Sequence, residues 1–207
     1  MATAKSQQQF ASPLLLPELR DRVAVLGGNA HQKTAFLIGL ALRQIRQHGT
    51  VLCLDARRHQ QTEVYFRLLL RHPTSYLSLP DSGEVPSVAA QAVLSTVSRS
   101  LATTPLLPPL LLFDSICETP DWERTVIFLL NAGATVVEVL PDSTALAFGR
   151  YDTVLLLREE TEAAEQFSRA VGRKVSATEL QQMRAGEGVL IHLAQVYRVV
   201  LPAMTKT

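Results

Sequence analysis

The feature that most constrains this chain is a strand–turn–helix–strand pattern near its start. Residues 23–26 form a short apolar run that stops at two glycines, and residues 33–48 follow with apolar side chains at helical spacing. Gly49 ends that helix, and a second apolar run, residues 51–54, leads into Asp55. Short apolar runs joined by a helix are typical of a βαβ unit whose strands are parallel and buried on both faces.

The same alternation continues along the chain. Further strands are expected at residues 76–79, 110–113, 135–140 and 153–157, and further helices at residues 61–71, 87–101, 120–132 and 162–171. Ser176 and Glu179 match a capping box that opens a helix up to about Ala185, and residues 189–193 and 196–201 predict a β-hairpin stopped by Pro202. The predicted fold class is α/β, with a mainly parallel sheet sandwiched by helices and a C-terminal β-hairpin.

Length and composition fit a single globular domain. The 207 residues are 47% hydrophobic and 19% charged, so the chain can bury a sizeable core. Residues 1–12 are polar and are expected to be a disordered tail, which leaves residues 13–207 as one domain. The formal net charge of +1 gives no support to charge-driven binding of nucleic acid.

Location is inferred from what the sequence lacks. The most apolar stretch, residues 106–113, is short and interrupted by two prolines, so no integral membrane segment is expected. The first residues contain no apolar core of a secretory signal, and a cytoplasmic protein is predicted. Two cysteines are too few for a disulfide framework; Cys53 and Cys117 are expected to be reduced, and Trp122 to anchor its helix in the core.

Residues 27–34 read GGNAHQKT and match a phosphate-binding loop in part. The motif G-x-x-x-x-G-K-[ST] turns backbone amides inward at a helix start, where a lysine reaches the outer phosphates and a hydroxyl holds magnesium. Gly27, Lys33 and Thr34 stand at the required spacing, whereas Gln32 replaces the second glycine and Ala30 stands inside the loop. The predicted nucleotide-binding residues are Gly27, Gly28, Asn29, Ala30, His31, Gln32, Lys33 and Thr34, with Thr34 also a predicted metal ligand.

The replaced glycine leaves alternatives open. In one interpretation the Gln32 side chain fills the space that a phosphate needs. In another, Gln32 or Asn29 donates hydrogen bonds to the phosphate. An ordinary strand-to-helix turn, followed by Lys33 and Thr34 by chance, is the third interpretation.

A second acidic strand end supports the phosphate-loop interpretation. The run LLLFDS places Asp114 directly after a buried strand, as in a Walker B element, where the carboxylate holds the magnesium shell. The next position, often a glutamate that activates the attacking water, is Ser115, which is a poor base. Glu118 is the candidate substitute. Asp114 and Glu118 are therefore the predicted catalytic residues, with Asp114 and Thr34 as predicted metal ligands; a turn or N-cap aspartate is the alternative role for Asp114.

The order of these segments resembles the RecA-like motor core of the FtsK/HerA group, which includes type IV secretion coupling proteins. The matching pieces, found between Arg22 and Pro202, are GGNAHQKT, TVLCLDARRHQ, LLLFDS, LLNAGATVVEVLPDS, YDTVLLLRE and SATELQQMRAGEGVLIHLAQVYRVVLP. The Walker A and B motifs are degenerate, and the polar sensor position after the fourth strand holds Leu140, Pro141 and Asp142.

The resemblance implies ATP and Mg²⁺ as ligands, and two functions. One is a catalytically weak or inactive nucleotide-binding and assembly module of a larger machine, such as a pilus, secretion or DNA-handling complex. The other is an active ATPase of the FtsK/HerA type. Either implies protein partners or a homo-oligomer, whereas nucleic acid is a possible partner without support in the sequence.

Overall fold

The computed structural model describes residues 22–47, 49–55, 76–78, 95, 109–114, 120–140, 150–158, 161–184, 186–193 and 195–201. The predicted tail and the predicted helices at residues 61–71 and 87–101 lie outside these residues, apart from Ser95. Cys117 and Pro202 also lie outside them.

One sheet of eight strands runs through the protein in the order β3-β2-β4-β5-β1-β6-β7-β8. The strands are β1 (Arg22–Leu26), β2 (Val51–Asp55), β3 (Tyr76–Ser78), β4 (Leu110–Asp114), β5 (Thr135–Val139), β6 (Thr153–Leu157), β7 (Glu187–His192) and β8 (Gln195–Val200). In this order, neighbouring strands from β3 to β6 are parallel to each other. The pairs β6–β7 and β7–β8 are antiparallel. The predicted α/β fold with a mainly parallel sheet and a closing hairpin is confirmed.

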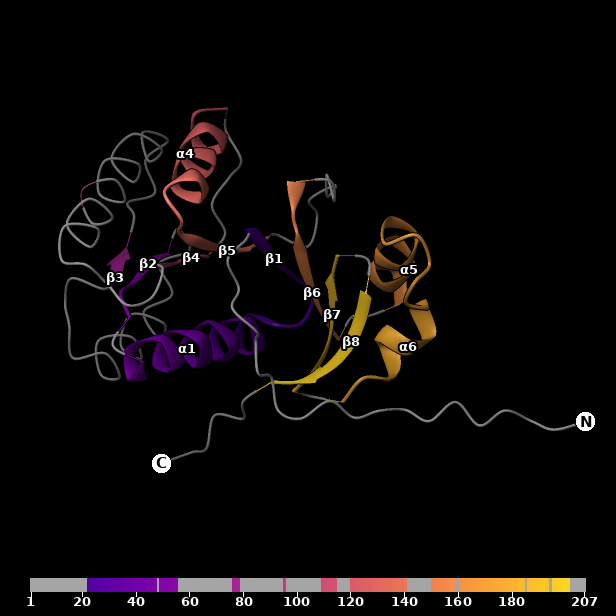
Figure 1. Ribbon diagram of the computed structural model, residues 1–207. Coiled ribbons are helices and arrows are strands. Elements are labelled where there is room, and N and C mark those ends of the chain that lie inside the picture. Colours follow the sequence, from indigo (N-terminus) through magenta and orange to yellow (C-terminus); the bar gives the residue numbers. More distant parts are fainter. Residues whose placement is uncertain are drawn as a thin grey trace, which may run out of the picture.

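Helices cover both faces of this sheet (Figure 1). Helix α1 (Ala30–Arg46) lies on one face, and α4 (Pro120–Asn131), α5 (Thr161–Ala170) and α6 (Ala177–Gln182) lie on the other. Side chains alternate along each strand, so Val23 and Val25 of β1 pack with α1, while Ala24 and Leu26 pack with α5 and α6. A third cluster joins α4 to β2, β4 and β5. The strands are apolar on both faces because both faces are core.

Several boundaries differ from the prediction. Helix α1 begins at Ala30 rather than Lys33, and α6 ends at Gln182 rather than near Ala185. At α6 the Ser176 hydroxyl accepts a hydrogen bond from the Glu179 amide at 3.1 Å, but the Glu179 carboxylate pairs with Arg198 at 2.6 Å. Only half of the predicted capping box forms, because β8 brings a charged partner to Glu179 that attracts the carboxylate more strongly than a neutral amide does.

A buried ionic cluster holds the middle of the sheet. Arg22, which is 2% exposed, donates to Glu138 from Nε at 2.6 Å and to Glu123 from Nη1 at 2.7 Å. Trp122 donates from Nε1 to Glu138 at 3.1 Å, and the Arg22 guanidinium lies 4.7 Å from the centre of the Tyr151 ring. Burial lowers the pKa of Arg22, but the hydrogen bonds of both carboxylates outweigh it and raise that pKa above its usual value. Arg22 is therefore charged throughout the range in which the protein is folded.

The predictions for Trp122 and Cys53 are confirmed. Trp122 is buried and meets Phe113 edge to face, with ring centres 4.6 Å apart, so it does anchor its helix. Cys53 is a buried free thiol. Within the described ranges, no helix has both the length and the apolar character needed to cross a bilayer.

Replacing Arg22 with methionine is expected to lower the free energy of unfolding by about 3–5 kcal/mol, because Glu138 would remain buried without its cation. Urea unfolding followed by circular dichroism measures the change. Arg198→Met is the matched control, since the pair it forms with Glu179 lies at the surface and is expected to contribute about 0–1 kcal/mol. An equal decrease in the free energy of unfolding in the two variants would contradict a structural role for the buried cluster.

Candidate phosphate-binding site

The candidate site is the turn between β1 and α1, at the carboxyl edge of the parallel strands. Ligands of open α/β sheets bind at this edge. Gly27 and Gly28 have φ of 73° and 70°, a left-handed conformation that glycine adopts without strain. The Gly28 amide donates to the Arg158 carbonyl at 2.9 Å. The turn is thereby attached to the end of β6 as well as to β1.

A complete capping box closes the start of α1. Asn29 is the N-cap, and its side-chain Oδ1 accepts from the Gln32 amide at 2.9 Å. In return, Gln32 Oε1 accepts from the Asn29 amide at 3.0 Å. The Lys33 amide already donates to the Asn29 carbonyl at 3.1 Å in the helical pattern. The expected open loop before Lys33 is therefore a glycine turn followed directly by a capped helix, since reciprocal capping satisfies amides that would otherwise lack partners.

Gln32 lies close against the glycine turn. A Cβ added to Gly28 would stand 2.8 Å from Gln32 Oε1 and 2.9 Å from Leu157 Cβ. Both distances are well inside van der Waals contact. The absence of a side chain at Gly28 thus allows the Gln32 carboxamide to approach the backbone and complete its hydrogen bond to Asn29.

Lys33 and Thr34 are the fourth and fifth residues of α1. They are 2% and 8% exposed, and Lys33 takes part in at least one interaction within the protein. Asn29 and His31 are exposed. The side chain of Ala30 lies outside the described part of the structure.

Asp114 is the last residue of β4, in register with Asp55 of β2 and Val139 of β5. Strand β5 lies between β4 and β1, so the end of β4 and the glycine turn share one edge of the sheet with a strand between them. The Asp114 side chain, Ser115 and Glu118 lie outside the described residues, and their roles stay predictions. The described residues contain no group of three metal-ligating side chains.

Two amides of this turn and helix start are already bonded within the protein. A phosphate is bound by backbone amides that point at it from the loop and the first helical turn. Here the amides of Asn29 and Gln32 are bonded to each other's side chains, and the Gln32 carboxamide lies over the turn. A phosphate bound to these two amides would have to replace the side chains of Asn29 and Gln32.

Two features of the structure were not predicted from the sequence, although each has a signal there. Asn29 and Gln32 have the spacing of a capping box, but the match to the phosphate-loop motif assigned both to a cradle. Glu138 is a charge within an otherwise apolar strand, and such a residue must have a buried partner. Arg22 is that partner.

Comparison with known proteins finds similarity in structure but not in sequence. No protein-family model and no curated protein matches the chain. A genome packaging NTPase from Sulfolobus turreted icosahedral virus 2, solved with AMPPCP, superposes with a TM-score of 0.67 at 10% identity, covering 90% of this chain and 100% of that one. The same NTPase with ATP-γS gives 0.64 at 11% identity, covering 89% and 100%.

The DNA-packaging ATPase from Sulfolobus turreted icosahedral virus gives a TM-score of 0.65 at 10% identity, covering 89% of this chain and 98% of that one. The chain therefore has a P-loop NTPase fold. At this identity the likeness concerns the fold alone.

Gly28→Ala is expected to destabilise the protein more than Gly133→Ala does. Both positions have positive φ, so each alanine costs roughly 1–2 kcal/mol of backbone strain. Only at Gly28 does the added Cβ also collide with Gln32 and Leu157, whereas nothing lies within 4 Å of it at Gly133. Thermal unfolding of the two variants measures the difference. Equal melting temperatures would contradict the close packing described for the turn.

Proposed function

We propose that this chain is a catalytically weak or inactive P-loop NTPase-like module whose phosphate cradle is closed by its own capping box, and that it serves in the assembly of a larger machine. The observation that carries the proposal is the reciprocal bonding of Asn29 and Gln32. It uses amides that a phosphate would need and places a carboxamide where the motif has glycine. The proposal treats residues 13–207 as one cytoplasmic domain.

The proposed group is FtsK/HerA-like, and the proposed machine handles DNA. The order of sequence segments supports the group. The DNA-packaging function in the names of the structural neighbours favours a DNA-handling complex over a pilus or secretion complex. Because the net charge is only +1, we propose that protein partners or copies of the same chain, rather than nucleic acid, provide the main contacts.

An active ATPase of the FtsK/HerA type is the second candidate. Lys33 and Thr34 follow Gly27 at the spacing of the motif, and the genome packaging NTPase to which the fold is similar was solved with AMPPCP and with ATP-γS. In this candidate, displacement of the Gln32 carboxamide admits ATP. Thr34 and Asp114 then hold Mg²⁺, and Asp114 and Glu118 carry the catalytic roles.

Replacing Gln32 with glycine tests the closed cradle. The glycine removes the carboxamide and restores the motif, so Mg²⁺-dependent binding of a non-hydrolysable ATP analogue is expected to tighten by at least about tenfold, or ~1.4 kcal/mol. Isothermal titration calorimetry on the full chain measures the affinity. The double variant Gln32→Gly, Lys33→Ala is the control and is expected to lose the gain, because the lysine would contact the outer phosphates.

The wild-type result separates the two candidates. Tight analogue binding by the wild type, weakened by Lys33→Ala and unchanged by Gln32→Gly, would contradict a closed cradle and favour the active ATPase. Circular dichroism of each variant checks that a loss of binding is not a loss of folding.

A further inference from the structure

Strand β8 is the edge of the sheet and carries exposed apolar side chains. β7 is its neighbour on one side, and β8 is the last strand in the sheet order among the described strands. The exposed large hydrophobic residues on the hairpin are Leu193 (73%), Val196 (40%), Tyr197 (39%) and Val200 (52%). Natural edge strands usually avoid pairing by means of lysine, proline or bulges. The outer strand of this hairpin carries one charged residue, Arg198, beside three valines, a tyrosine and a glutamine.

The outward-facing backbone groups of β8 follow from its register with β7. Leu201 donates to the Gly186 carbonyl at 2.6 Å, and His192 lies opposite Gln195 at the hairpin turn. Residues that exchange hydrogen bonds across an antiparallel pair alternate with residues that do not. The odd-numbered residues of β8 therefore bond to β7. The amides and carbonyls of Val196, Arg198 and Val200 point away from the sheet.

From this arrangement we infer that β8 pairs with β8 of a second copy of this chain, antiparallel and about a two-fold axis at Arg198. Such an axis places Val196 opposite Val200 of the second copy, and Val200 opposite its Val196. All of these residues have outward-facing backbone groups, so each opposed pair exchanges its hydrogen bonds. The valines form apolar cross-strand pairs on both sides of the axis. The strand is complementary to itself, which is what a two-fold interface requires.

The charges on β8 agree with this pairing. The axis brings Arg198 opposite Arg198 of the second copy, and like charges directly opposite are destabilising. Each Arg198, however, already pairs with Glu179 of its own α6, with Nη2 and Oε1 2.6 Å apart. The centre of the interface then holds two arginines and two glutamates, with no net charge.

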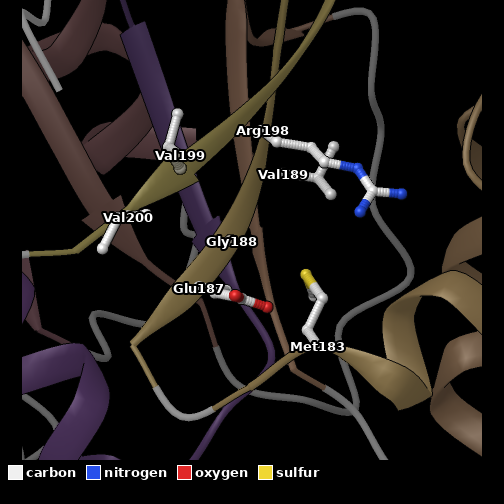
Figure 2. A pocket seen from close by; sticks show the side chains of 7 residues that line it. All are labelled: Met183, Glu187, Gly188, Val189, Arg198, Val199 and Val200. Carbon is white, nitrogen blue, oxygen red and sulfur yellow. The ribbon is translucent and has the colours of Figure 1, made fainter. Parts of the chain in front are cut away.

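A small cavity lies beside β8. Figure 2 shows Met183, Glu187 and Arg198 around a small cavity that β7, β8 and the end of α6 enclose, and Val200 also lines it. In the paired state Val196 of the second copy lies next to this cavity. On the opposite face of the sheet, Tyr197 lies opposite Val199 of the second copy.

The expected interface is small. Stable protein pairs bury roughly 1,200–2,000 Å² in total, and one strand pair with its flanking side chains stands at or below the low end of that range. We therefore expect a dimer that forms in a concentration-dependent way. This inference rests on the assembly part of the proposed function and does not depend on nucleotide.

Sedimentation velocity of the full chain without nucleotide, over a range of concentrations, tests the pairing. The wild type is expected to show a monomer–dimer equilibrium. Val196→Lys with Val200→Lys is expected to raise the dissociation constant at least about tenfold. Ile127→Lys with Phe128→Lys is the matched control, since both residues are exposed apolar side chains on α4, away from β8, and it is expected to leave the equilibrium unchanged. A monomer at every concentration, or a dimer insensitive to the β8 variant, would overturn the inference.

Disulfide trapping tests the register. In a Cys117→Ser background, Arg198→Cys is expected to form a covalent dimer on mild oxidation, since opposed hydrogen-bonded residues have Cα atoms about 5.5 Å apart. Val196→Cys, which faces a valine of the second copy, is expected to remain uncrosslinked. Equal crosslinking of the two variants would overturn the proposed axis. Because neither assay contains nucleotide, failure here leaves the calorimetric test of the cradle unaffected, and failure of the cradle leaves these assays unaffected.

Discussion

The ion pair between Arg22 and Glu138 fixes the geometry on which the rest of the molecule depends. It joins β1 to β5 in the middle of the sheet, and Trp122 joins the same carboxylate to α4. One face of the sheet has separate core clusters under α4 and under α5 and α6. The charged groups lie where these clusters meet, so a shift of β1 against β5 would separate buried opposite charges. The position of β1 in turn sets the position of the glycine turn.

Much of the fold could be predicted from apolar runs and their spacing. Strands such as β4 and β6 are buried on both faces, and their sequences carry that information directly. The strand order could not be predicted in this way, because it depends on which apolar runs lie side by side and not on the runs themselves. The partners of Arg22 show the same limit of prediction from sequence. A buried charge signals that a partner exists, yet the identity of that partner comes from residues more than a hundred positions away.

The glycine turn was predicted in its position but not in its conformation, and the roles of the predicted site residues stay predictions. The motif predicts a helix that begins at Lys33, whereas α1 begins at Ala30 and Lys33 is its fourth residue. The same residues match two motifs, a phosphate-binding loop and a capping box. The capping box forms because Gly28 leaves room for the Gln32 carboxamide and because each side chain satisfies an amide of the other residue. The spacing of the residues does not predict which of the two motifs forms.

The capped helix start also changes what the protein needs in order to be folded. In a glycine-rich cradle, the amides at the helix start lack a partner until an anion binds. Binding then stabilises the folded protein through mass action. Here the amides of Asn29 and Gln32 are bonded within the protein. Under the proposed function, the order of this helix start does not depend on the supply of nucleotide. A part with that property can hold its place in an assembly whatever the energy state of its surroundings.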